Sequence, residues 1–398
     1  MDDGRRDEGW AAPQPTPPQP TPPRPTGQGL YAAALGRILQ HLCDHGPATI
    51  SALAEIAQVS RPTVQRALTE LEQLGLAAEA DPLAVPMGRP ARTWGAAPAE
   101  ELVLAIDVRR GESAVQVRRL TGPLLVEETL DHEPLRTRAA GDAFAPGLLS
   151  AIGEILDRHG IDRAQILETA IGVSGIVDDD GTVLVSIHLP ELTGVPLAAL
   201  AASTLDLASV QVENDMNLRA LGELRTGAAR GLGTFLYLTN HQFHRPAVVI
   251  DGRPWHGAHR GVGEGDVLSA TGVLPATLTH RGRTERYFDV ARLIDDGDLP
   301  EDWVPVVHER LAAVIAVLSY ALDPEAVLVH GGPLTTSPAA LADLEQRVAG
   351  LLRAPVSPRI LAASPGEDHT IVGALSIALR QALGRVLQVE DPPLPDLH

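Results

Sequence analysis

The chain of 398 residues is long enough for two or three domains, and its hydrophobic content of 44% indicates globular cores. Its formal net charge of −19 argues against general coating of nucleic acid, because proteins hold polyanions chiefly by neutralising phosphates. The single cysteine, Cys43, excludes an internal disulfide framework and a multi-cysteine zinc site. The N-terminus is polar and the longest apolar run, 311–322, is too short to span a bilayer, so we expect a cytoplasmic protein without membrane contact.

Residues 1–27 are expected to form a disordered arm. Pro, Thr and Gln dominate residues 11–26, and this composition supports neither helical nor sheet hydrogen bonding. A ligand for a proline-binding groove is the alternative, but a plain tail is the simpler interpretation.

Residues 28–97 have the pattern of a winged helix-turn-helix. Apolar residues recur at helical spacing in three short segments, and the third begins at Ser60, a favourable N-cap, and stops at Gly75. The following stretch predicts a two-stranded hairpin with strands at 76–78 and 91–94. A compact DNA-binding domain has this outline.

The third helix carries side chains suited to reading base edges. In a helix-turn-helix, the second helix of the motif enters the major groove, where Arg pairs with guanine and Gln with adenine. On the wing, arginines can lie along the phosphate backbone or in the minor groove. We therefore expect DNA contacts from Arg61, Thr63, Gln65 and Arg66 on the helix, and from Arg89 and Arg92 on the wing. The alternative is a dimerisation or protein-docking module whose arginines are only solvated.

Residues 98–398 alternate predicted strands and helices, which indicates α/β layers. The apolar runs 101–108 and 169–177 are typical of buried strands. We divide this body into a first lobe at 98–216 and a second lobe at 217–398. Whether the final helix returns to the first lobe stays open.

This body resembles the ROK family of sugar kinases and repressors. The most specific match is VENDMNLRALGE at 212–223, against the family pattern V-E-N-D-x-N-x-x-A-x-x-E. Further matches follow in the family's order, at 172–178, 249–252, 257–259, 263–264 and 323–332. The resemblance implies the two-lobed fold of actin-like ATPases and ribonuclease H-like sugar kinases. The preceding winged helix places the chain beside the family's repressors.

Both phosphate-binding loops depart from the family pattern. Phosphoryl transfer needs glycines that let backbone amides approach the phosphates. The family's D-x-G-G-T appears as DVRRGE at 107–112, and its G-T-G-x-G-G aligns with HQFHRP at 241–246. Asp215 matches the family's base, but we expect no catalytic residue and no ATP turnover. The family's Cys-rich zinc segment is absent, with Val267 in place of a His, so we expect no metal and no cofactor.

Part of the family's sugar pocket is retained. Asn214, Asp215 and Glu264 match sugar-contact positions, and His188 stands where the family usually has Asn. The resemblance thus implies a small effector between the lobes, which could be a sugar, a modified sugar, a sugar phosphate or another small molecule. Alternatively, Asn214 and Asp215 only cap the following helix and Glu264 makes an ordinary hydrogen bond.

These features predict a transcriptional regulator, with a repressor as the first choice. It would bind a double-stranded, pseudo-palindromic DNA operator as a homodimer or homotetramer, and a sugar-like effector would shift its operator affinity. One alternative is a weak or altered sugar kinase with a DNA-binding arm. Another is a DNA-binding oligomer that responds to no ligand.

Overall fold

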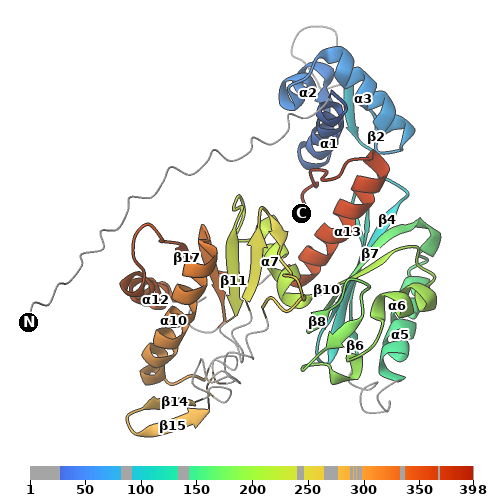
Figure 1. Cartoon of the computed structure of the whole chain (residues 1–398). Helices are drawn as coiled ribbons and strands as arrows, with labels where there is room; N and C mark the ends of the chain where they lie inside the picture. The colour runs from blue at the N-terminus through green and yellow to red at the C-terminus, as the bar shows by residue number, and fades with distance from the viewer. Residues whose placement is uncertain are drawn as a thin grey trace, which may run out of the picture.

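The computed structural model describes residues 27–81, 92–132, 143–239, 246–263, 277–286, 290, 293, 298–331, 337–365 and 368–397. Several expectations fall outside these ranges, namely those on the proline-rich arm, Arg89, most of the second phosphate loop, Glu264 and Val267. Within them, a winged helix is followed by two α/β lobes, and it lies against helix α13 (His369–Leu387) and the first of these lobes (Figure 1).

The winged helix consists of three helices and a small antiparallel sheet of order β1-β3-β2. Its elements are α1 (Gly27–His45), β1 (Ala48–Thr49), α2 (Ile50–Ala57), α3 (Arg61–Gln73), β2 (Ala77–Ala80) and β3 (Thr93–Ala96). The predicted hairpin is confirmed as β2 and β3, although both strands begin one or two residues later than expected. Strand β1, which pairs with β3 at the edge of the hairpin, was not predicted.

The first lobe contains a sheet of order β10-β7-β4-β5-β6. Its elements are β4 (Leu102–Val108), β5 (Glu112–Arg119), β6 (Leu124–Asp131), α5 (Phe144–Arg158), β7 (Ile166–Val173), β8 (Ile176–Val177), β9 (Val183–Val185), α6 (Leu197–Leu205) and β10 (Val210–Asn214). Alternate residues of β4 face opposite sides, as a strand requires. Leu104 and Ile106 belong to the core with α5 and α6, whereas Val103 and Ala105 belong to a second core under the C-terminal helix.

The second lobe contains a sheet of order β13-β12-β11-β16-β17. Its elements are β11 (Phe235–Thr239), β12 (Pro246–Ile250), β13 (Arg253–Pro254), β14 (Thr277–His280), β15 (Arg283–Arg286), α10 (Val304–Leu322), β16 (Ala326–His330), α12 (Pro338–Leu351) and β17 (Arg359–Ala362). Short 3-10 helices occur at Arg163–Gln165, Pro190–Leu192 and Glu301–Trp303. Numbered within its own lobe, each sheet has the strand order 3-2-1-4-5, with strands 1, 2 and 3 antiparallel and strands 1, 4 and 5 parallel. This repeated topology confirms the predicted two-lobed sugar-kinase fold.

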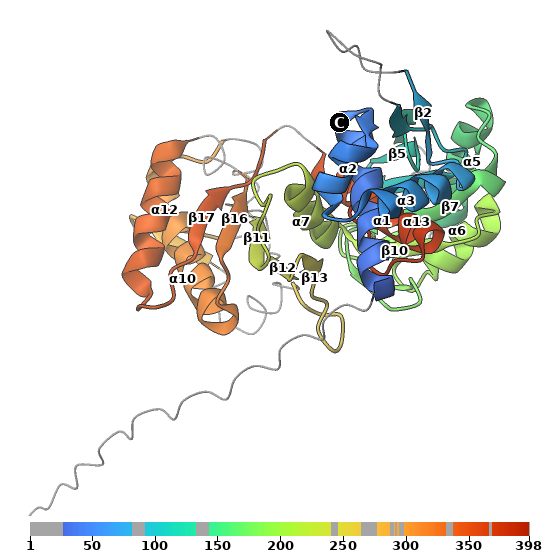
Figure 2. The ribbon, with the colours of Figure 1, turned by 90° about the horizontal axis from the view of Figure 1, so that it is seen from above.

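Two helices, α7 (Asp215–Arg225) and α13 (His369–Leu387), cross between the lobes (Figures 1 and 2). The last helix, α13, packs against β4 and β7 of the first lobe. The two backbones touch at Gly222 and Gly373. A Cβ on Gly222 would lie 2.0 Å from the carbonyl oxygen of His369, and one on Gly373 would lie 1.9 Å from that of Leu218. No side chain fits at this crossing, so glycine is required on both helices.

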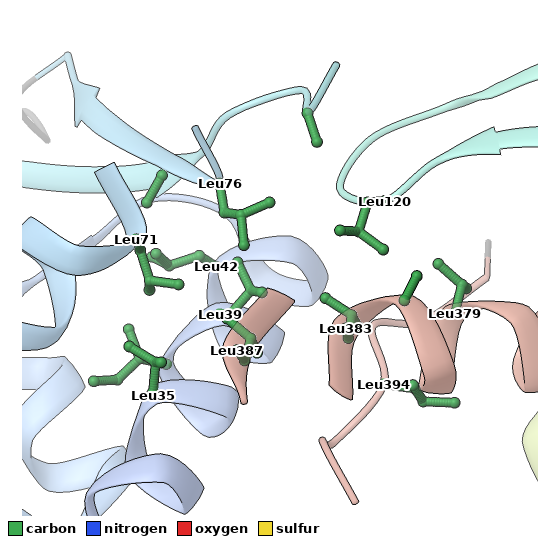
Figure 3. Packing of buried hydrophobic residues seen from close by; sticks show 14 of the residues in the cluster. Leu35, Leu39, Leu42, Leu71, Leu76, Leu120, Leu379, Leu383, Leu387 and Leu394 are labelled. Carbon is green, nitrogen blue, oxygen red and sulfur yellow. The ribbon is translucent and has the colours of Figure 1, made fainter. Parts of the chain in front are cut away.

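The winged helix and the first lobe share one hydrophobic core. Leu35, Leu39 and Leu42 of α1 belong to the same buried cluster as Leu383 and Leu387 of α13 (Figure 3). The cluster continues through α3 and the turn after β5, as the labelled Leu71 and Leu120 show. The DNA-binding module is therefore packed against the body, and burial of leucine side chains resists its separation.

Two helices are longer and more apolar than expected from the sequence. The segments Glu301–Leu322 and His369–Leu387 have mean hydropathies of 1.4 and 1.3 and are long enough to cross a membrane. The apolar run 311–322, expected from the sequence to be too short to span a bilayer, is part of the first of these segments. Within the fold, α10 packs on the second sheet and α13 on the first, where their leucines and isoleucines form cores. Their apolar character is explained by this packing.

Candidate functional site

Helix α3 presents three long polar side chains to solvent. Ser60 caps the helix, accepting a hydrogen bond from the backbone N–H of Thr63 at 3.4 Å, as its N-cap position predicts. Arg61, Gln65 and Arg66 are exposed at the N-terminal half of the helix. The opposite face is anchored in the core by Val64, Ala67, Leu68 and Leu71. The helix thus offers a recognition face of the kind that enters a major groove.

Two residues of this face already have partners within the domain. The guanidinium of Arg66 lies 4.7 Å from the ring centroid of Tyr31 on α1, a cation–π contact. The Tyr31 hydroxyl in turn donates to Glu70 at 2.6 Å; burial, and then this hydrogen bond, raise the pKa of Tyr31 to about 12. The hydroxyl of Thr63 lies 2.8 Å from that of Ser60. Of the four side chains expected to contact DNA from α3, Arg61 and Gln65 are therefore the ones not shown in contact with another side chain of the domain.

On the wing, Arg92 is paired with an acidic residue. Its Nε and Nη2 atoms donate to both carboxylate oxygens of Glu79 across the hairpin, at 2.6 and 2.5 Å. This pair lowers the pKa of Glu79 and raises that of Arg92. This pairing was not expected from the sequence. Because the pair is exposed, phosphate can compete with it at small cost.

The carboxyl ends of β4, β7 and β10 meet at one edge of the first sheet, which is where open α/β sheets bind ligands. Asn214 ends β10 and caps α7, accepting from the backbone N–H groups of Met216 and Asn217 at 2.8 and 3.3 Å. Its Nδ2 donates to the carbonyl oxygen of Gly175 at 2.7 Å. Asp215 is the first residue of α7, half-buried, and its Oδ1 also accepts from Met216. The capping role considered for Asn214 is therefore present in the structure.

Glu213, which the sequence reading did not single out, organises this edge. Only 3% exposed, it accepts from the Asn214 backbone N–H at 2.7 Å and from Asn217 Nδ2 at 2.9 Å. Its other oxygen lies 2.7 Å from His256 Nε2, and His256 follows β13 of the second lobe. Arg260 makes a further pair from the second lobe, with Asp179 between β8 and β9. Only Glu213, as part of the matched motif, had a sequence signal.

These inter-lobe pairs border a small hollow. It is lined by Gly175, Val177, Glu213, Asn214, Asn217, His256, Arg260 and Val262, and its volume is about 10 Å³. That is room for about one water molecule. His188, half-buried after β9, and Asp215 are not among the described residues that line it. Between the described residues, a sugar-sized ligand would therefore require the lobes to move apart.

Arg109 fills the first phosphate loop. It stands where the family pattern has a glycine, and its guanidinium donates to Asp107 at 2.6 Å. The same guanidinium pairs with Glu112 at 3.5 Å and with Asp368, which precedes α13. Asp107 is 2% exposed, and burial raises its pKa while Arg109 opposes that rise. A side chain held by three carboxylates thus occupies the turn that a phosphate would need.

The described residues contain no group of three or more His, Cys, Asp or Glu side chains placed to hold a metal ion. The acidic residue that ends the matched motif, Glu223, is fully buried and serves the backbone instead. It accepts from the backbone N–H groups of Ala228 and Ser364, both at 2.8 Å. Its role in this structure is to hold the ends of α7 and β17 together.

Comparison with known protein families adds two matches. The ROK family model matches residues 104–265, and the MarR family model matches residues 36–83. The chain contains a ROK-family domain. The MarR-type match covers the second half of α1, then β1, α2, α3 and β2, and so includes all of the winged helix except the start of α1 and strand β3.

Relatives of two kinds are found. The chain is 27% identical over 313 residues to kanosamine kinase of Amycolatopsis mediterranei, covering 71% of this chain and 98% of that protein. It is 24% identical over 237 residues to the DNA-binding transcriptional dual regulator NagC of Escherichia coli K12, covering 59% and 56%. The chain spans about half the length of several curated relatives it matches.

Among solved structures, a ROK family transcriptional regulator, described as a homologue of the Escherichia coli MLC protein, has a similar fold. The TM-score is 0.66 at 21% identity, and the match covers 90% of this chain and 98% of the other. A ROK hexokinase from Thermus thermophilus matches 69% of this chain with a TM-score of 0.51 at 21% identity. The regulator match extends over the winged helix as well as the lobes, because it covers more of the chain than the lobes alone provide.

Proposed function

We propose that this chain is a DNA-binding transcriptional regulator, acting as a repressor in the cytoplasm, whose ROK domain binds a sugar-like effector. The observation that carries the proposal is the exposed recognition face of α3 on a winged helix that shares its core with the lobes. Such packing lets a change in the lobes alter the position of α3, which a flexible tether would not do. The similarity of this chain to NagC, a DNA-binding transcriptional regulator, supports the same proposal.

DNA contact would be local. The chain carries a formal charge of −19, so phosphate attraction over its whole surface is unfavourable. Arg61, Gln65 and Arg66 supply donors on one helix face, and we propose further contacts from Thr63, Arg92 and Arg89, of which Arg89 lies outside the described residues. Because one helix-turn-helix reads one half-site, a homodimer or homotetramer on a pseudo-palindromic double-stranded operator fits this small surface.

The first phosphate loop favours a regulator over a kinase. Arg109, clamped by carboxylates, stands where backbone amides would have to approach the phosphates. We therefore propose that the domain has lost ATP turnover. Similarity to kanosamine kinase supports a second candidate function, that of a weak sugar kinase. A coupled ADP-release assay over a sugar panel distinguishes them, because turnover that disappears in Asp215→Asn would establish the enzyme.

The effector would bind at the edge formed by Asn214 and Asp215, and we propose His188 and Glu264, which lies outside the described residues, as further contacts. Opening the inter-lobe pairs of Glu213 with His256 and of Arg260 with Asp179 would make room for it. A thermal-shift screen of sugars, sugar phosphates and amino sugars tests this, since a ligand that binds only the native state raises its melting temperature. No shift with any compound would favour the oligomer that responds to no ligand.

Selection of binding sites from fragmented genomic DNA of the source organism tests the regulator itself. We expect a shared pseudo-palindrome for the wild type and its loss in Arg61→Ala/Gln65→Ala, since each bidentate base contact is worth about 1–3 kcal/mol. Enrichment that survives in this variant would move the DNA-reading surface away from α3. Absence of any enriched sequence, with and without the screened compounds, would refute the proposed function.

A further inference from the structure

The segment that follows α13 returns along the molecule and contacts each of its parts. We call residues 388–397 the strap. Its start is marked by Gln388, which ends α13 in the left-handed conformation at φ 55° and reverses the chain. The strap then runs beside α1, where Leu394 is 4% exposed and belongs to the core shared with the winged helix. Figure 3 shows Leu394 beside Leu379 and Leu383 of α13.

On one side, the strap is fixed to the winged helix. Gln40 of α1 donates to the carbonyl oxygen of Leu394 at 3.1 Å, and Asp44 accepts from the backbone N–H of Asp396 at 2.6 Å. One turn before Gln40, Gly36 lets α1 approach the ring of Pro393, since a Cβ there would lie 2.6 Å from Pro393 Cδ. Any displacement of the strap along α1 would break these contacts together.

On its other side, the strap is fixed to both lobes. Arg118 of β5 donates to the carbonyl oxygens of Asp396 and Leu397 at 3.3 and 3.2 Å. Arg225, the last residue of α7, donates to the carbonyl oxygen of Pro395. From the second lobe, Arg253 of β13 lies 3.4 Å from Asp391. The arginines of β5 and α7 bind backbone carbonyls, so these contacts depend on the position of the strap.

Helix α7 connects this strap to the effector edge. Its first residue follows Asn214 at the hollow, and its last residue, Arg225, holds the strap. Eleven helical residues span about 16 Å and move as a rigid rod. A change at the inter-lobe pairs would therefore shift Arg225, and with it the strap and α1.

We propose that the strap is a coupling device that transmits rearrangement of the two lobes to the DNA-binding winged helix. The inference rests on the proposed function for its purpose, but the coupling itself exists in the protein without DNA. Arg225 is its positioning residue, and the strap's contacts with α1 are its output. Lobe opening would release the strap from α1 and change the orientation of α3.

Cys43 is a built-in reporter of strap position. It is the chain's one cysteine, and it lies with Asp44, Arg118 and residues 395–397 around a cavity of about 780 Å³. Burial raises the pKa of the Cys43 thiol to about 12, so alkylation is slow while the strap is in place. Displacement of the strap would expose the thiol and speed its alkylation.

The test is a double-mutant cycle read by the alkylation rate of Cys43 with iodoacetamide. Arg260→Ala removes an inter-lobe pair, and we expect it to speed alkylation about fivefold, the lower limit of typical allosteric coupling. In an Arg225→Met background the same change should have no further effect, whereas in Arg225→Lys, which keeps a donor, it should persist. Gly36→Ala, which favours helix but pushes on Pro393, should speed alkylation by itself.

Equal effects of Arg260→Ala in the wild type and the Arg225→Met background would overturn the coupling, and so would no effect in either. Circular dichroism melting of each variant shows that the fold is retained, and Gly36→Ala keeps the test available should Arg225→Met unfold. Because alkylation needs no DNA, failure to select an operator would refute the proposed function alone. Operator binding that persists while the cycle shows no coupling would refute the strap alone.

Discussion

Leu383 lies in the core that the winged helix shares with α13, and its removal tests whether the two parts are stabilised together. Its side chain is 0% exposed and belongs to the cluster that includes Leu39 and Leu42. Truncating a fully buried leucine to alanine costs about 2–5 kcal/mol, because transfer energy is lost and a cavity is left. We therefore expect Leu383→Ala to lower the local stability of the shared core by about 3 kcal/mol.

The assay is amide hydrogen exchange, because a chain of several bodies has no single free energy of unfolding. A loss of about 3 kcal/mol corresponds to roughly hundredfold faster exchange of the slowest amides. We expect this acceleration in α13 and equally in α3, although α3 is remote from residue 383 in sequence. Leu311→Ala, at a 0% exposed position in the second-lobe core, is the matched control. It should accelerate exchange in α10 and leave α3 unchanged.

An α3 whose exchange is unaffected by Leu383→Ala would refute the shared core. The winged helix would then be stable alone, and its contact with α13 would contribute little. Exchange that accelerates in α3 for both variants would instead show that the whole chain opens at once, which contradicts the separate second-lobe core.

Three further predictions concern single positions. Gly373→Ala should lower the melting temperature through a loss of about 2 kcal/mol or more, because its Cβ would meet the carbonyl oxygen of Leu218 at 1.9 Å. The control Gly153→Ala on α5 should not lower it, because its Cβ would lie 3.4 Å from Leu205 Cδ2, an ordinary contact distance. Ser60→Ala should cost about 1 kcal/mol by removing the α3 N-cap, and Ser60→Asp should restore it; equal urea midpoints for all three proteins would contradict this role. Phenolate absorbance, compared with that of Tyr31→Phe, should show Tyr31 ionising near pH 12. Because its pKa is higher in the folded chain than in the unfolded one, its contribution to stability is complete below pH 10 and is lost as the pH rises through about 12. Ionisation near pH 10 would refute the burial of Tyr31.

The local elements were predictable because their signals are local. Ser60 and Gly75 bound α3 through capping and a helix stop, and the apolar run 101–108 became a central buried strand. The family motif at 212–223 pointed to the edge where we propose that the effector binds, since its Glu213 and Asn214 end β10 there. The order of these predicted elements along the chain was enough to predict the fold class.

The long-range contacts were not predictable, because nothing in the separate segments encodes their meeting. Arg92 was expected at phosphate, yet the hairpin register brings Glu79 to it. His256 carries no recognisable pattern, and only the placement of β13 brings it to Glu213. The sequence predicted a domain boundary between residues 97 and 98, whereas α13 and the strap join the winged helix to the body from more than three hundred residues away.

Whether α3 reads a specific DNA sequence can be measured as the affinity of the protein for its selected operator at near-physiological salt. Fluorescence anisotropy should show about hundredfold weaker binding for Arg61→Ala/Gln65→Ala, from two lost base contacts. The control Arg158→Ala/Arg283→Ala changes two arginines that are 60% and 73% exposed on the lobes, and it should bind within about twofold of the wild type. Equal operator affinity of the α3 variant and the control would show that α3 does not read the DNA sequence.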